Sequence, residues 1–200
     1  MSRMQMMFTV VGVGLVVMWF SSYAGGSEGS LLERLQSEDA NVRDAALRTI
    51  TRERRAKIEA LEKMVREYTS RPDLKGTAKS VILALGKLEA QASIALLLEH
   101  LTFAVFYMDV KKPPSVGDRF PCVQALTDIG VASVEPVLEH VVRSDSDVPT
   151  VVLCGAGVLH GVLGKDRAIV LLESKLKGDL EEEARNRLKL LLDGLKKYPR

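Results

Sequence analysis

One helical unit recurs along this chain with similar residues at matching positions. Residues 82–101 read ILALGKLEAQASIALLLEHL, and residues 123–141 read VQALTDIGVASVEPVLEHV. Both carry an Ala-Leu pair, a break, an Ala-Ser-apolar restart and a closing Leu-Glu-His. Such repetition is typical of stacked helices, in which each unit buries its apolar face only against its neighbours. We therefore expect an all-α fold, a right-handed α-solenoid of about four helix pairs.

Apolar residues at helical spacing predict where the individual helices lie. Residues 40–70 contain no Gly or Pro, so this segment is either one long helix or two helices bent near residues 51–55. Pro72 ends it, because the residue before a proline avoids the helical conformation. Further helices are expected at 74–88, 90–101, 119–130, 133–143, 148–163 and 166–176, with a C-terminal capping helix at 180–197.

An insertion at residues 102–118 is the longest break in the expected domain. It joins a stretch rich in aromatic and β-branched residues to the sequence KKPPSVGD. Aromatic and cationic side chains are favoured in binding hot spots, and long loops on a rigid scaffold often carry function. The alternative is that the aromatic side chains only fill a widened gap between the second and third helix pairs. The candidate binding residues are Phe103, Phe106, Tyr107, Lys111, Lys112 and Phe120.

The first 24 residues have the features of a secretory signal peptide. A basic start is followed by an uncharged apolar stretch at 6–20, and Ser22 and Ala24 have the spacing of a small-x-small cleavage site. The alternative is a retained membrane anchor over residues 4–24, because that stretch approaches the length of about 20 residues that a spanning helix needs. Residues 25–30 are expected to form a flexible leader. In both cases the repeat domain, residues 31–197, is expected outside the cytoplasm, periplasmic or secreted.

The chain as a whole is nearly neutral. Its formal net charge is +2, and loss of residues 1–24, which hold one arginine, leaves +1. A nucleic-acid partner is therefore not expected. Basic charge is concentrated at residues 48–71, where eight Lys or Arg residues stand against four glutamates. We interpret most of this segment as a solvated helix face, with contact to an anionic lipid or an acidic protein as the alternative.

The polar residues do not form the pattern of a catalytic or metal site. His100 and His140 occupy matching positions on repeats that stack about 10 Å apart, too far for both to bind one zinc ion. Cys122 and Cys154 are expected to be buried and unbridged, because packed helix axes lie farther apart than a disulfide spans. A group of glycines in an apolar stretch lacks the strand and Lys-Ser/Thr pair of a phosphate loop and is expected to allow close helix packing: Gly155, Gly157, Gly161 and Gly164. We therefore expect no enzymatic activity, no metal and no cofactor.

Three segments carry a family resemblance: Asp39–Ala46 (DANVRDAA), Ala84–Leu88 (ALGKL) and Ala125–Gly130 (ALTDIG). They resemble the HEAT-like repeats, in particular the short bacterial type named after phycobilisome lyases, over roughly residues 31–176. The Asp-x-x-Val-Arg element occurs once, and the repeat interval, counted between Glu99, Glu139 and Glu173, falls from 40 residues to 34. The overall plan is also similar to small exported HEAT-repeat proteins of bacteria. The resemblance implies the fold and says little about function, because such repeats serve many roles.

These observations favour a non-enzymatic protein–protein interaction scaffold that acts outside the cytoplasm. The alternative is a membrane-anchored structural module that uses the N-terminal segment and the basic residues 48–71. A third hypothesis, implied by the resemblance alone, is a chromophore-handling protein like the bilin lyases. The sequence does not indicate which protein the scaffold binds.

Overall fold

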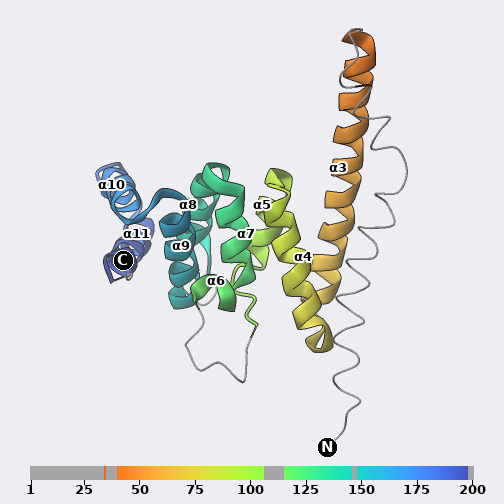
Figure 1. Ribbon diagram of the computed structural model, residues 1–200. Coiled ribbons are helices and arrows are strands. Elements are labelled where there is room, and N and C mark those ends of the chain that lie inside the picture. Colours follow the sequence, from red (N-terminus) through yellow and green to blue (C-terminus); the bar gives the residue numbers. More distant parts are fainter. Residues whose placement is uncertain (1–33, 35–39, 106–114, 146–147, 198–200) are drawn as a thin grey trace, which may run out of the picture. The chain divides into compact units, whose positions relative to one another are not determined.

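The computed structural model describes residues 34, 40–105, 115–145 and 148–197, and every regular element among them is helical (Figure 1). The all-α class predicted from the sequence is therefore confirmed. The chain divides into two units, Met1–Glu59 and Ala60–Arg200, with the boundary inside helix α3 (Ala40–Tyr68). The segment predicted to be a signal peptide or anchor and the predicted leader lie outside the described residues.

Helix α3 is continuous, which confirms the first of the two alternatives for this segment. Its last two turns belong to the second unit, where Leu61 and Val65 are buried. Ser93 is also buried, and its hydroxyl donates a hydrogen bond of 2.6 Å to the Glu62 carboxylate of α3. The helix ends before the 3-10 turn η1 (Pro72–Leu74), as the proline predicts.

The remaining helices follow the predicted order, with ends that differ by a few residues. The 3-10 turn η2 (Gln91–Ser93) replaces the first turn of the helix predicted at 90–101, and the 3-10 turn η3 (Gly130–Ser133) joins the helices predicted at 119–130 and 133–143. The short helix α6 (Val116–Arg119) was not predicted; Ser115 and Asp118 form a capping box at its start. The other helices are α4 (Lys75–Lys87), α5 (Ile94–Glu99), α7 (Pro121–Ile129), α8 (Val134–Arg143), α9 (Val148–Leu163), α10 (Lys165–Leu176) and α11 (Glu182–Lys197).

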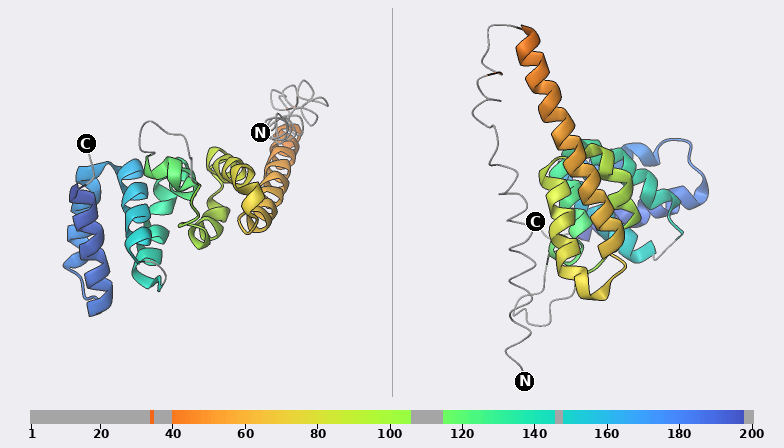
Figure 2. Two further views of the ribbon diagram at one scale, coloured as in Figure 1. Left: turned by 90° about the horizontal axis from the view of Figure 1, so that it is seen from below. Right: turned by 90° about the vertical axis from the view of Figure 1, so that its right-hand side faces the viewer.

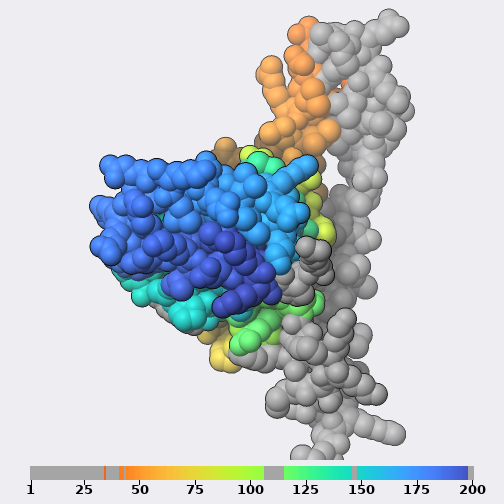
Figure 3. Space-filling view, turned by 90° about the vertical axis from the view of Figure 1, so that its left-hand side faces the viewer, coloured from red at the N-terminus to blue at the C-terminus, as the bar shows by residue number. Residues whose placement is uncertain are grey.

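Helices α4, α7, α9 and α11 of the second unit pack one on the next, in the order in which they occur along the chain. Helix α4 packs on α7, α7 on α9, and α9 on α11. The intervening helices pack beside them, with α5 against α7 and α8, α8 against α9, and α10 against α9 and α11. The left view of Figure 2 shows this progression from α4 in yellow to α11 in dark blue. Helices α10 and α11 form the surface of the unit at its C-terminal end (Figure 3).

Three glycines allow helices of this unit to approach closely. A Cβ atom added at Gly86 of α4 would lie 2.6 Å from the Cα of Ala125 in α7. An added Cβ at Gly161 of α9 would lie 2.6 Å from a methyl carbon of Thr127, and one at Gly155 would lie 2.7 Å from a methyl carbon of Val141. The packing role predicted from the sequence is therefore confirmed for Gly155 and Gly161. It is wrong for Gly164, where an added Cβ would meet no atom within 4 Å and a positive φ is what favours glycine.

The turn after each of α4, α7 and α9 contains one residue with positive φ. These residues are Glu89 with φ 47°, Gly130 with φ 81° and Gly164 with φ 77°. The backbone of Gly130 and Gly164 (ψ −146° and 160°) lies in a region that is essentially restricted to glycine. Glu89 adopts the left-handed conformation without the freedom of a glycine, and this strains its backbone.

Both cysteines are buried, as the sequence predicts. Burial raises the pKa of the Cys122 thiol, and nearby Cys154 raises it further. The thiol of Cys122 therefore stays protonated at neutral pH and is a poor nucleophile.

Within the described part of the chain, α9 and α10 satisfy the length and hydropathy of a membrane span only together, as a pair bent by 117°; no single helix does so.

Candidate functional site

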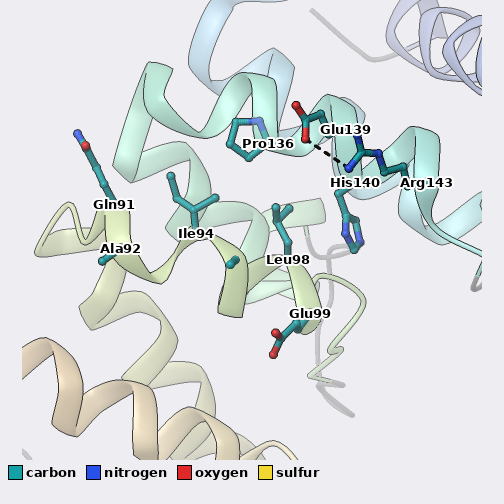
Figure 4. Close-up of a pocket in the computed structure, with 10 residues that line it drawn as sticks. Gln91, Ala92, Ile94, Leu98, Glu99, Pro136, Glu139, His140 and Arg143 are labelled. Atoms are coloured by element: carbon teal, nitrogen blue, oxygen red, sulfur yellow. Dashed lines mark ion pairs between the residues drawn. The ribbon is translucent and has the colours of Figure 1, made fainter.

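An open groove of about 550 Å³ lies between α5 and α8 in the second unit (Figure 4). Its floor is apolar: Ile94 and Leu98 point from α5 toward α8, and Pro136 points back from α8. An apolar concavity with a few polar groups at its edge is the usual form of a binding site. The groove is therefore the candidate functional site of the described chain.

Helical periodicity explains why these residues share the groove. On the α5 side the lining residues recur at i, i+3, i+4, i+7 and i+8, and on the α8 side at i, i+3, i+4 and i+7. Each helix thus presents one continuous stripe to the groove. The α5 stripe starts in η2 and consists of Gln91, Ala92, Ile94, Ala95, Leu98 and Glu99; the α8 stripe consists of Pro136, Glu139, His140 and Arg143.

The edge of the groove carries exposed ion pairs. Glu139 lies 4.0 Å from Arg143 on α8, and Glu99 of α5 lies 3.3 Å from the guanidinium of Arg66 on α3. All four side chains are more than half exposed, and ion pairs of this kind contribute little to stability. The two carboxylates can therefore exchange these arginines for a cation on a ligand without a large loss of folding free energy.

His140 is one of the titratable residues that line the groove. Partial burial lowers its pKa, so the imidazole is neutral at neutral pH and can both donate and accept a hydrogen bond. His100 follows α5 at the matching position of the sequence repeat, and burial lowers its pKa as well. Both imidazoles therefore take up a proton only below the ordinary pKa of histidine.

The binding residues predicted from the insertion are only partly within the described residues. Phe103 is half-buried, whereas the ring of Phe120 is 3% exposed and packs in the core, with the guanidinium of Arg119 at 5.1 Å from its centroid. A backbone hydrogen bond of 2.9 Å from Val105 to Arg119 ties the two ends of the insertion together. The remaining four residues lie outside the described residues, and the binding role of the set stays a prediction: Phe106, Tyr107, Lys111 and Lys112.

Sequence reasoning did not single out the α5–α8 groove. The signal that marks it is the repeated Leu-Glu-His, which contributes Leu98 and Glu99 to one wall and Glu139 and His140 to the other. The Glu of the motif lines both walls, whereas the Leu comes from the first copy and the His from the second. A single sequence does not show which side of a helix is left uncovered.

Within the described ranges, no three His, Cys, Asp or Glu side chains are grouped so that they could hold a metal ion. No known family model matches the chain, and no curated protein or solved structure was found to be similar to it.

Proposed function

We propose that this chain is a non-enzymatic scaffold that binds a segment of another protein in the α5–α8 groove. The observation that carries the proposal is the apolar floor of a groove of about 550 Å³, bordered by exposed carboxylates. Protein-binding sites combine an apolar centre with a polar rim in this way.

We further propose that the second unit is a HEAT-like α-solenoid with α11 as its cap. The positive-φ residues support this, because they follow α4, α7 and α9 at intervals of 41 and 34 residues, close to the intervals of the sequence repeat. The neighbours of α8 support it too. This helix presents Pro136 to α5, while Glu135 forms an ion pair of 2.5 Å with Lys175 of α10. A helix with a neighbour on each side is what a stack requires.

The chemistry of the groove defines the expected partner segment. Apolar side chains of the partner would cover Pro136 and the parts of Ile94 and Leu98 that remain exposed, since burial of apolar area is the main source of affinity. A Lys or Arg beside them would meet Glu99 or Glu139. The partner segment is therefore an amphipathic helix or extended strand that carries apolar anchors and at least one cation.

The expected site of action is outside the cytoplasm. This part of the proposal rests on the uncharged stretch at residues 6–20 and the small residues after it. The mass of the mature chain isolated from its native source tests it. A mass that lacks about 24 residues supports cleavage of a signal peptide.

A peptide-display selection against the full chain tests the groove. Ala95 is an exposed alanine inside the groove, and Ala56 is an exposed alanine on α3 outside it. Ala95→Trp fills the groove without disturbing the core, and Ala56→Trp is the matched control. We expect selected peptides to combine apolar and basic residues, and to bind Ala95→Trp at least tenfold more weakly than wild type.

The control variant should bind the same peptides with unchanged affinity. A second variant, Glu139→Lys, should lower the affinity for peptides that carry a cation. It should leave the affinity unchanged for peptides in which that cation is replaced by Gln. Peptides that bind Ala95→Trp as tightly as wild type would overturn the assignment of the groove.

A further inference from the structure

The first unit contains a short stretch of helix with unusually dense positive charge. Residues 48–57 of α3 hold five basic side chains and one acidic residue, Glu53, so the stretch carries a net charge of +4. Every one of these basic side chains is exposed: Arg48, Arg52, Arg54, Arg55 and Lys57. A chain with a total formal charge of +2 thus concentrates its positive field on three turns of one helix.

Contacts within the fold account for only part of these charges. Arg55 pairs with Glu59 at 2.8 Å, but both side chains are more than half exposed, so the pair contributes little to stability. Arg48, Arg52 and Lys57 take no part in the ion pairs and side-chain hydrogen bonds of the described residues. The net charge of +4 within ten residues disfavours the helix through repulsion of like charges, and a bound anion would relieve that repulsion.

An exposed apolar pair lies on the side of α3 that also carries Arg54 and Lys57. Leu47 is 52% exposed and Ile50 is 39% exposed, and residues three apart share one side of a helix. Exposed aliphatic side chains among arginines are typical of helices that lie in a membrane interface, where the apolar groups enter the acyl boundary and the cations meet the headgroups. A partner bound only by charge, such as a nucleic acid or an acidic protein tail, would not bury the aliphatic pair.

We propose that residues 47–57 of α3 bind the surface of an anionic lipid bilayer. Leu47 and Ile50 enter the interface, and Arg54 and Lys57, on the same side of the helix, meet the headgroups. The other three basic side chains add long-range attraction to the anionic surface. The surface shares no residue with the α5–α8 groove, so this inference does not depend on the proposed protein partner. A signal peptide at residues 1–24 or an anchor at residues 4–24, as the sequence predicts, would bring the chain to a membrane, which is where the proposed contact would operate.

A fluorophore on α3 tests the contact in the full-length chain. Thr51 is exposed on the same turns, and Thr51→Cys offers a single accessible thiol because Cys122 and Cys154 are buried. An environment-sensitive dye at this position reports only whether α3 meets lipid, whether or not residues 4–24 insert. We expect a blue shift with vesicles of phosphatidylcholine and phosphatidylglycerol, its reversal by added salt, and no shift with phosphatidylcholine alone.

Charge variants identify which residues make the contact. In the dye-labelled chain, the triple variant Arg48→Gln, Arg52→Gln and Lys57→Gln should need about a hundredfold more anionic lipid for the same shift. The matched control removes three exposed basic residues from the second unit (Arg167→Gln, Lys177→Gln and Lys189→Gln) and should stay within about twofold of the parent chain. Glutamine is a good helix former, so α3 is retained in the variant.

Three outcomes would overturn the proposal. The first is a dye that does not respond to anionic vesicles, and the second is an equal loss of binding in the two triple variants. The third is a dye response to soluble polyphosphate or polyglutamate that is as large as the response to vesicles, together with a vesicle response that the double substitution Leu47→Ser and Ile50→Ser does not change. That result would assign the surface to a soluble polyanion instead of a membrane.

Discussion

Gly86 of α4 lies so close to Ala125 of α7 that an added Cβ would be 2.6 Å from the Cα of Ala125. The clash would be with backbone, which cannot rotate away as a side chain can. Although alanine is the better helix former, we expect Gly86→Ala to lower the free energy of unfolding by about 1–3 kcal/mol. Urea denaturation measures this change.

Gly76 in the same helix is the control, because an added Cβ there meets no atom within 4 Å. Gly76→Ala should raise the free energy of unfolding by up to about 1 kcal/mol through helix propensity. Equal effects of the two substitutions would contradict the close packing of α4 and α7.

Glu89 holds a left-handed backbone conformation, with φ 47°, at the turn after α4. Glu89→Gly removes the steric strain of the side chain, and we expect it to raise the free energy of unfolding by about 1 kcal/mol. The matching position after α7 is already glycine, and Gly130→Ala should lower that free energy by about 1–3 kcal/mol. Thermal unfolding of both variants provides the test, and a destabilised Glu89→Gly protein would show that the turn is not strained.

The sequence predicted the helices of the second unit well because the core residues recur at helical spacing. The segment 148–163 was predicted with its observed ends, since polar residues bound an apolar run on both sides. Helix α6 was missed because four residues are too few for a periodic signal. The strain at Glu89 was also missed, because a glutamate does not mark a turn in the way that Gly130 does.

The candidate groove was harder to predict than the fold. Its floor residues, such as Ile94 and Leu98, look like ordinary core positions, and both are in fact largely buried. What makes a groove is the side of each helix that its neighbour leaves uncovered, and this depends on helix spacing and rotation that one sequence does not encode locally. The dense charge of α3, by contrast, was visible in the sequence. Only the structure shows that its basic side chains are exposed.

Leu97 of α5 is fully buried, at 0% exposure, in agreement with the predicted core. Leu97→Ala should lower the free energy of unfolding by about 2–5 kcal/mol because it leaves a cavity. Leu190 of α11 is 52% exposed, and Leu190→Ala should change that free energy by less than about 0.5 kcal/mol. Chemical denaturation distinguishes the two, and a Leu97→Ala protein as stable as wild type would remove Leu97 from the core.

Arg187 attaches α11 to the turn between α8 and α9. Its buried guanidinium donates a hydrogen bond to the carbonyl of Ser144 and pairs with Glu183 at 2.6 Å. Arg187→Met keeps most of the apolar contact and leaves that carbonyl without its charged donor, so we expect a loss of about 2 kcal/mol. Arg185 on the same helix makes one long contact, of 3.5 Å, and Arg185→Met is the control, with an expected change below about 0.5 kcal/mol. Equal melting temperatures for the two variants would contradict the role of Arg187.

The half-buried histidines His100 and His140 should make the protein less stable in mild acid. Burial lowers the pKa of both in the folded state, so the unfolded chain binds more protons as the pH falls through about 6.5. Stability is therefore complete above that pH and declines as the pH falls toward the folded-state values. The carboxyls of Asp73 and Asp118 also have lowered pKa values, below 3.8. These two groups therefore do not contribute to a change in stability between about pH 7 and pH 5, where the histidines titrate. Urea denaturation across that range should show a decline for wild type and a smaller one for His100→Gln with His140→Gln. Parallel pH profiles for the two proteins would show that these histidines are not the cause.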